Sequence, residues 1–486
     1  MRESPDKSGR FTLLLSSLMA VQLLALDDVL CDFGGNPWTL RAAVEGVQIF
    51  GATGSGKTSG SGQALARTFL AHGFGGLVLT AKPDDPDLWL TYAAQTDRAR
   101  DLIIVAPDAP YRFNFIEYEH KRPDPGGGLT ENLVNLFTRA IEAIGRHTQT
   151  SSDSFWIEAP RQLLRNAIDT LALAGAPVTL PNIKRLIDEA PRSPEQTRSA
   201  TWQDTTLFAD CLAVLLKQHT RPPPEGNPPE LDLAVRYWTT EFPGLGEKTR
   251  SSVVSSFTAM ADPLLRGVLY KLFCTETNIR PEDTFAGKII LLNLPIKQFG
   301  AAGRAVQVLF KSVWQDAVER RPRREDALPV FLWADEAQYF LTSHDTLYQQ
   351  TARSARACTV YLTQNLSNYH LELSRHDAKH FVEGLLGNLA TKIFHANDHI
   401  ETNRFAADLI ARTWARRFSM SLGDNSNSST ISQSLDYQLQ PQDFQTLRRG
   451  GREHAGHVDA IVFRGGISWP SNGKNYLKVA FDQGAL

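Results

Sequence analysis

The chain has 486 residues, of which 42% are hydrophobic, and its 51 lysines and arginines nearly balance its 53 aspartates and glutamates. This length suits two or three structural units of ~100–200 residues, and the balance excludes a global basic field that would mark a nucleic-acid binder. The four cysteines lack paired spacing, which argues against a disulfide framework and a structural zinc site and favours a reducing cytoplasm.

The N-terminal part begins with a mostly apolar run at residues 11–26, interrupted by two serines and a glutamine. A spanning helix needs about 20 predominantly apolar residues. This shorter run therefore predicts a helix that is buried or covered by a partner. Residues 28–33 and 38–42 flank a Gly-Gly-Asn sequence, and they predict a small hairpin.

An alternation of strands and helices follows. Residues 47–50 form a short apolar run that ends at glycine, residues 57–72 carry apolar side chains at helical spacing, and residues 77–79 are again apolar. The pattern predicts strand, loop, helix and strand. Residues 102–105 predict a further strand, and the turn-rich RPDPGGG at residues 122–128 suits a domain boundary.

The middle of the chain, from residue 129 to about residue 265, has a mostly helical pattern. Residues 156–173 form its clearest amphipathic segment. The proline-rich stretch at residues 221–230 predicts a loop inside this unit. We therefore expect an inserted all-helical domain.

The α/β alternation resumes beyond the helical unit. A strand is expected at residues 288–294, a helix at residues 302–320 and a buried strand at residues 330–334. Further on, the Ser/Asn-rich run at residues 422–434 predicts a solvated polar connector.

A glycine-rich motif, GATGSGKT, lies between the strand expected at residues 47–50 and the helix that follows it. The motif matches G-x-x-x-x-G-K-[ST], in which backbone N–H groups surround phosphate oxygens at the start of a helix. Lys57 is expected to neutralise the β and γ phosphates of ATP, and the Thr58 hydroxyl to help hold Mg²⁺. A glycine-rich turn without a ligand does not explain the Lys-Thr pair. The nucleotide-contacting residues are expected to be Gly51, Ala52, Thr53, Gly54, Ser55, Gly56, Lys57, Thr58 and Ser59.

A phosphate loop also needs carboxylates at the end of a buried strand, and PVFLWADEAQ at residues 329–338 supplies two. Asp335 is expected to hold Mg²⁺, directly or through one of its ligands, and Glu336 to act as the general base that polarises the attacking water. The alternative is an acidic helix start, where Asp and Glu serve as caps. The phosphate loop makes the catalytic interpretation the stronger one.

A further strand is expected at residues 358–363, and Gln364 follows it. An amide at this position is suited to sensing the γ phosphate or positioning the water, whereas an ordinary polar strand end is the alternative. Arg353 and Arg356 precede the strand. In ring ATPases an arginine at such a place can reach the neighbouring subunit's nucleotide and stabilise transition-state charge, and a solvated helix end is the alternative.

With these residues in view, the chain resembles the coupling proteins of type IV secretion and conjugative DNA transfer, within the FtsK/HerA superfamily of P-loop ATPases. The resemblance runs over most of the chain and depends on an ordered set of motifs. These motifs are GATGSGKT, FNFIEYE, SFWIEAPRQLL, KTRSSVVSSF, GKIILLNLP, WADEAQ, YLTQN and TKIFHANDHIETNRFAADLI.

The resemblance implies an α/β fold with a RecA-like P-loop nucleotide-binding domain and an inserted all-α domain. Residues 1–128, with the N-terminal helix and hairpin, and residues 266–486 would form the two parts of the nucleotide-binding domain, and residues 129–265 the insertion. It also implies a homo-hexamer with ATP and Mg²⁺ at subunit interfaces and a central channel of DNA size. Family logic favours Arg353 as the arginine that acts on a neighbour, with Arg250 and Arg356 as weaker candidates.

The chain departs from the family pattern in two places. Family members commonly carry an N-terminal anchor of two membrane spans, whereas the phosphate loop begins here at Gly51. Relatives often have Asp-x-Lys-Gly after the second strand, whereas this chain has LTAKPDD, which retains Lys82 without the flanking acid and glycine. The role of Lys82 is therefore open. His395 and His399 lie four residues apart, but no cysteine joins them and solvated side chains are favoured over a metal site.

The leading hypothesis is an ATP-hydrolysing ring motor that moves single- or double-stranded DNA without sequence preference. The expected location is the cytoplasm, with the inner membrane reached only through partners such as a relaxase or secretion-channel proteins. One alternative is a soluble translocase in genome handling or defence against foreign DNA. The other is a receptor that docks cargo at the helical unit and uses nucleotide as an assembly switch.

Overall fold

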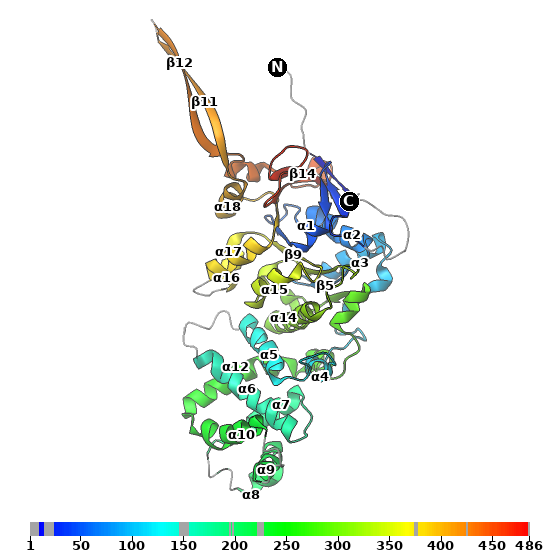
Figure 1. Cartoon of the computed structure of the whole chain (residues 1–486), viewed down its shortest axis with the longest axis vertical. Coiled ribbons are helices and arrows are strands. Elements are labelled where there is room, and N and C mark those ends of the chain that lie inside the picture. The colour runs from blue at the N-terminus through cyan, green and yellow to red at the C-terminus, as the bar shows by residue number, and fades with distance from the viewer. Residues whose placement is uncertain are drawn as a thin grey trace.

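The computed structural model describes residues 9–13, 24–144, 155–193, 196, 199–220, 228–373, 378–423 and 426–484. It has an α/β core in its upper part, a helical body below and a thin β-ribbon that projects from the top (Figure 1). The α/β class expected from the alternating pattern is confirmed. In the described part of the chain, no helix is both long enough and apolar enough to traverse a bilayer.

A mixed sheet forms the centre of the core, in the order β3-β2-β1-β14-β13-β10-β4-β9-β8-β5-β7-β6. Neighbouring strands from β10 to β6 all pair in parallel. Most of these strands are continuous apolar runs, as expected when helices cover both faces of a parallel sheet. The parallel strands are β4 (Val47–Phe50), β5 (Gly75–Leu79), β6 (Leu102–Val105), β7 (Ile289–Leu292), β8 (Val330–Ala334), β9 (Ala357–Thr363) and β10 (Thr391–Phe394).

Mixed pairing extends the other edge of the sheet. Its strands are β13 (His457–Arg464), β14 (Tyr476–Asp482), β1 (Gly9–Leu13), β2 (Val29–Phe33) and β3 (Pro37–Thr39). The helix expected over residues 11–26 is wrong at its start, because β1 pairs in parallel with β14 and antiparallel with β2. Residues 14–23 of that run lie outside the described residues.

Helices cover the core sheet. They are α1 (Leu40–Val44), α2 (Gln63–Ala71), α3 (Asp85–Gln95), α14 (Ile296–Arg320), α15 (His344–Ala352), α16 (Leu366–Leu373), α17 (Ala378–Asn388) and α18 (Ile400–Ile410). The helix α14 is the longest of these and lies between the sheet and the helical body, where it packs against α5 (Thr130–Ile144) (Figure 1).

The helical body lies at the end of the molecule opposite the ribbon (Figure 1). Its interior is aromatic: Trp238 packs edge-on against Phe208, and its indole N–H donates to Thr170 Oγ1 at 2.8 Å. Besides α5, the helices of this region are α4 (Phe115–Lys121), α6 (Phe155–Leu173), α7 (Leu180–Glu189), α8 (Ala200–Thr205), α9 (Leu207–Thr220), α10 (Pro229–Arg236), α11 (Phe242–Gly244), α12 (Glu247–Leu264) and α13 (Gly267–Phe273).

The projecting ribbon consists of β11 (Arg412–Gly423) and β12 (Ser426–Tyr437), paired antiparallel along their whole length. The polar connector expected at residues 422–434 is therefore wrong. The Ser/Asn-rich composition of this run is typical of a solvated loop, although its backbone forms most of a strand. The side chains of Trp414, Ile431 and Leu435 are exposed on the ribbon.

Candidate active site

The phosphate loop follows β4 and leads into a π-helical turn, η1 (Thr58–Gly62), and then α2. Gly56 has a φ of +82°, a left-handed conformation that glycine adopts without strain, and an added Cβ would lie 2.6 Å from the Val458 side chain. Gly51 N–H donates to the Thr363 carbonyl at 3.3 Å, and Ala52 N–H donates to the Ala396 carbonyl at 3.0 Å. Segments next to the loop thus fix its backbone.

The loop opens onto a cavity of about 300 Å³. Residues from both sequence motifs and Gln364, which follows β9, line it, so the fold brings these candidate site residues around one space. The lining residues are Ala52, Thr53, Gly54, Ser55, Gly56, Lys57, Thr58, Ser59, Gln63, Lys82, Leu88, Tyr92, Glu336 and Gln364.

The acidic pair follows β8, at the same edge of the sheet as the phosphate loop. Thr58 Oγ1 donates a hydrogen bond to Asp335 Oδ2 at 2.9 Å, and Asp335 Oδ1 accepts from the Glu336 N–H at 2.9 Å. Lys57 Nζ lies 3.6 Å from Glu336 Oε1. A threonine hydroxyl beside a carboxylate is a donor set that suits Mg²⁺.

Glu336 is held in an uncommon conformation. Its backbone has φ 55° and ψ 50°, a left-handed geometry that costs a residue with a Cβ of order 1 kcal/mol or more. Gln338 Nε2 donates to Glu336 Oε2 at 3.0 Å, and Thr363 Oγ1 donates to Gln338 Oε1 at 2.8 Å. Gln364 Nε2 donates to Glu336 Oε1 at 3.4 Å. The carboxylate is thus oriented from β9, the strand that lies between β4 and β8.

Two amides therefore contact the candidate base, of which sequence reasoning singled out only Gln364. Gln338 was missed because a glutamine two residues after an acid has no distinctive pattern by itself. Its role appears only through the contact with Thr363 of the neighbouring strand.

Lys82 points to the acidic pair. Its Nζ lies 3.4 Å from Asp335 Oδ2 and 3.7 Å from Glu336 Oε1. Burial acts to lower the pKa of Lys82, but the carboxylates of Asp335, Glu336 and Asp85 outweigh burial and raise it. The ammonium group of Lys82, from the LTAKPDD segment, is therefore a positive charge held beside both acids.

Asp85 is a buried carboxyl next to this cluster that sequence reasoning did not single out. Its Oδ2 accepts hydrogen bonds from the backbone N–H groups of Ala81 and Lys82 at 3.0 and 2.9 Å. Burial raises its pKa to about 6, against the opposing effect of the Lys82 backbone hydrogen bond. The sequence signal for Asp85 is its position three residues after Lys82, at the start of a helix. Aspartates that only cap a helix occur in the same pattern.

The solvated side chain that was expected for His395 is wrong. His395 is fully buried behind the phosphate loop: its Nδ1 lies 3.1 Å from the Asp459 carbonyl, and its Nε2 lies 2.7 Å from Ser61 Oγ. An N–H on Nδ1 donates to the carbonyl, so Nε2 accepts from the hydroxyl. Burial lowers the pKa of His395 to about 3, which keeps the ring neutral. His399 caps α18, where its Nδ1 accepts from the Thr402 N–H at 3.2 Å.

The three candidate arginines lie in different environments. Arg353 is 54% exposed and its nearest carboxylate is Glu45 at 3.8 Å. Arg356 is buried and donates to the Leu24 carbonyl. It is therefore not placed to reach the nucleotide of a neighbouring subunit. Arg250, in α12, donates from Nη1 to the carbonyls of Pro243 and Leu245 at 3.5 and 3.4 Å, which lie just before that helix.

No protein-family model matches the chain, and no curated protein matches it in sequence. Solved structures of the bacterial conjugative coupling protein TrwB match it over 99% of its length. The unbound form of TrwBdeltaN70 gives a TM-score of 0.62 at 14% identity, with 94% of that chain covered. TrwB with the non-hydrolysable ATP analogue ADPNP gives a TM-score of 0.59 at 15% identity, with 95% of that chain covered. TrwB with ADP and Mg²⁺ gives a TM-score of 0.60 at 15% identity, with 94% of that chain covered. The chain therefore has the fold of a conjugative coupling protein, as its motifs predicted.

Proposed function

We propose that this chain, which has the fold of a conjugative coupling protein, binds ATP with Mg²⁺ at the cavity above β4 and hydrolyses it. The observation that carries the proposal is the contact between the two motifs, in which Thr58 Oγ1 lies 2.9 Å from Asp335 Oδ2. The TrwB structures with ADPNP and with ADP and Mg²⁺ support a nucleotide and this metal as the ligands.

Each residue has a role that follows from its place. The backbone N–H groups of the loop and the start of η1 offer donors and positive field to phosphate oxygens. Lys57 supplies a charge for the β and γ phosphates, and Thr58 with Asp335 would hold Mg²⁺. The ion, when bound, supplies neutralisation of the charge that develops on the phosphates.

Glu336 is the proposed general base. Its carboxylate faces the cavity beside Lys57 and Lys82, and Gln338 and Gln364 fix its orientation. A base held in this way can take a proton from a water near the γ phosphate without first rearranging. Gln364, at the tip of β9, is placed to position the same water.

We propose further that hydrolysis drives the movement of DNA by a ring of copies of this chain. The support is the shared fold with a conjugative coupling protein and the surface location of Arg353, whose side chain is available to an adjacent subunit. The DNA contacts are expected to be local and to phosphates, because the net charge of the chain is −2. A location in the cytoplasm, with partners such as a relaxase or channel proteins, belongs to the same proposal.

The rate of ATP hydrolysis, measured alone and with single- or double-stranded DNA, tests this function. A low basal rate that rises with DNA is expected. Absence of hydrolysis in every condition would contradict the proposal. Removal of the helical body, with ATPase activity retained and cargo binding lost, would favour the receptor function instead.

A further inference from the structure

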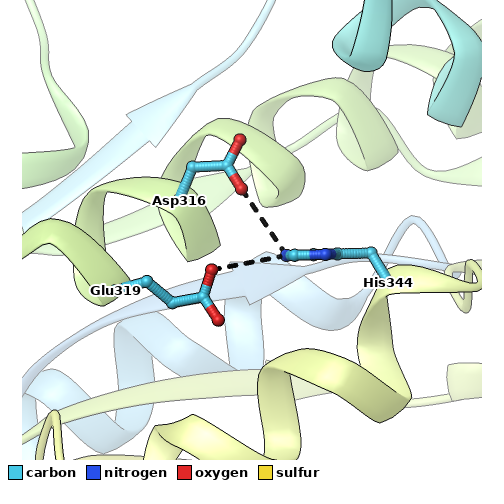
Figure 2. Close-up of side chains that lie close together, drawn as sticks. All are labelled: Asp316, Glu319 and His344. Atoms are coloured by element: carbon cyan, nitrogen blue, oxygen red, sulfur yellow. Dashed lines mark ion pairs between the residues drawn. The ribbon is translucent and has the colours of Figure 1, made fainter. Parts of the chain in front are cut away.

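Three side chains from two helices meet at the boundary between the core and the helical body, away from the nucleotide cavity. Asp316 and Glu319 are one turn apart on α14, and His344 is the first residue of α15. Their ligand atoms all lie within 4.8 Å of one another. Figure 2 shows the imidazole pointing between the two carboxylates.

The distances are too long for hydrogen bonds. His344 Nε2 lies 3.5 Å from Asp316 Oδ1 and 3.8 Å from Glu319 Oε2, whereas N–H···O bonds fall at about 2.7–3.2 Å. Nε2 is buried and has no hydrogen-bond partner among the described residues. Two ligands about 2.1 Å from one ion at a tetrahedral angle are about 3.4 Å apart, close to the observed separations.

We propose that Asp316, Glu319 and His344 bind a divalent first-row transition-metal ion. A neutral imidazole together with two carboxylate oxygens is a mixed ligand set that suits Zn²⁺ or Mn²⁺ better than Mg²⁺ or Ca²⁺, which prefer oxygen alone. Three protein ligands leave coordination positions for water. The three side chains are 13–29% exposed, so the group is partly open to solvent although Nε2 itself is buried.

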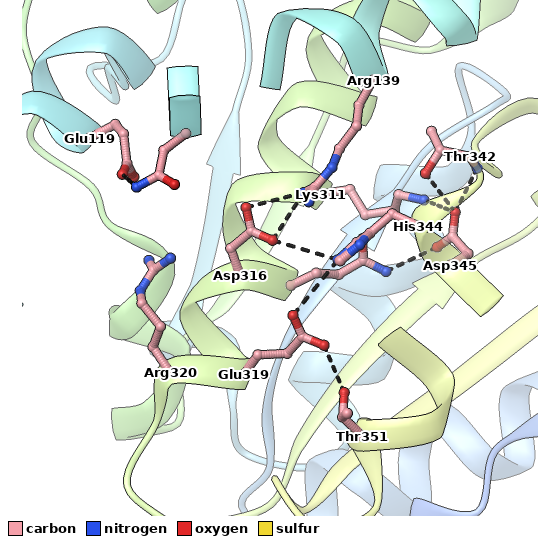
Figure 3. Close-up of polar contacts among 12 residues, drawn as sticks. Glu119, Arg139, Lys311, Asp316, Glu319, Arg320, Thr342, His344, Asp345 and Thr351 are labelled. Atoms are coloured by element: carbon pink, nitrogen blue, oxygen red, sulfur yellow. Dashed lines mark hydrogen bonds and ion pairs between the residues drawn. The ribbon is translucent and has the colours of Figure 1, made fainter. Parts of the chain in front are cut away.

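The surrounding contacts orient the ligands. Thr351 Oγ1 donates to Glu319 Oε1 at 2.6 Å, which leaves Oε2 directed to the imidazole. Arg139 Nη1 donates to both oxygens of Asp316 at 2.9 and 3.1 Å (Figure 3). Partners of this kind fix ligand geometry in metal sites.

The charge balance allows a cation in spite of Arg139. The two carboxylates outnumber the one guanidinium, so the group has a net charge of about −1 before an ion binds.

An ion at this position would connect three elements. It would join α14 to α15 directly, and α5 of the helical body through the bonds between Arg139 and Asp316. The ion would thereby stiffen the junction between the helical body and the core. The inference does not depend on the proposed ATPase activity.

Calorimetric titration of the full chain with ZnCl₂ or MnCl₂, without nucleotide and after treatment with a chelator, tests the site. The wild type is expected to bind one ion at this site and to gain thermal stability, whereas His344→Gln and Glu319→Gln lose that binding by at least tenfold. Ions held by Thr58 and Asp335 at the nucleotide cavity would be unaffected by either change. The matched control is His380→Gln, which removes an exposed histidine 3.6 Å from Glu383.

A second variant tests the surroundings. Thr351→Val keeps the side-chain shape but removes the donor to Glu319, and about tenfold weaker ion binding is expected with the thermal midpoint of the ion-free protein near that of the wild type. The proposal is overturned if the wild type shows no saturable binding. It is equally overturned if His344→Gln binds the ion as tightly as the wild type, which would mark the binding as adventitious.

Discussion

Thr58 Oγ1 and Asp335 Oδ2 are hydrogen-bonded at 2.9 Å although 277 residues separate them in the chain. The helical body and several strands lie between them in sequence, and the sheet brings them back to one edge because β9 lies between β4 and β8. This contact joins the two motifs in one site.

Replacement of Lys57 by alanine is expected to abolish nucleotide binding. The side chain is buried at the cavity beside Glu336, and no other lysine of the loop can neutralise the phosphates. Titration with a fluorescent ATP analogue measures the effect. Lys297→Ala is the control, because Lys297 is exposed and lines an adjacent cavity. Undiminished binding by Lys57→Ala would exclude the loop as the phosphate site.

Glu336→Gln is expected to bind ATP but to hydrolyse it at least ~10²-fold more slowly, because the amide cannot accept the proton from water. The change preserves the size of the side chain and an acceptor oxygen for Gln338. Single-turnover hydrolysis and nucleotide binding are measured on the same sample. Full turnover by this variant would show that Glu336 is not the base.

Arg353→Ala is expected to retain nucleotide binding and to lose about 10³-fold in hydrolysis, if its guanidinium stabilises charge in a neighbouring subunit. Mixing it with Lys57→Ala should restore part of the activity, since a Lys57→Ala subunit still offers Arg353 to an intact site. The control is Arg323→Ala, which removes another exposed arginine. Wild-type hydrolysis by Arg353→Ala would eliminate this candidate.

The buried Asp85 predicts a pH dependence of stability. Its pKa is about 6 in the folded chain and 3.8 ordinarily, so the folded state holds the proton more tightly. Stability therefore falls as pH rises from about 4 to about 7, by up to about 3 kcal/mol from this group. Asp85→Asn can keep both bonds from Ala81 and Lys82, which fall on one oxygen. The thermal midpoint of Asp85→Asn minus that of the wild type should increase between pH 5 and pH 7.5. A difference that stays constant over this range would contradict the prediction.

Lys311→Met is expected to destabilise the core by about 3–5 kcal/mol, because it leaves the Asp345 carboxylate buried without its cation. Lys311 and Asp345 form an ion pair (Figure 3), and both side chains are essentially inaccessible. Lys311 Nζ also donates to the Phe340 carbonyl at 2.7 Å. Urea unfolding measures the change in the free energy of unfolding. Adding Asp345→Asn should recover part of the loss, and an additive double variant would show that the two groups do not interact.

Much of the fold could be predicted from local pattern. The runs at residues 102–105 and 330–334 are strands with those bounds, because short uninterrupted apolar runs are typical of parallel strands in a covered sheet. The run at residues 47–50 is also a strand with those bounds, although Gln48 interrupts its apolar side chains. The strand β1 could not be predicted in this way, because one of its two partners, β14, lies more than 400 residues away in sequence and no local pattern indicates such a pairing.

The sequence by itself determined the identity of the candidate site residues, because a phosphate loop and an acid pair depend on contiguous residue types. Only the tertiary structure decided which further groups join them: Gln338, held by Thr363, donates to Glu336, Lys82 lies beside both acids, and Arg356 is buried. The reason is physical. The charge of a side chain is encoded at its position, whereas its burial, its partners and its pKa depend on elements that the sheet brings together from distant parts of the chain.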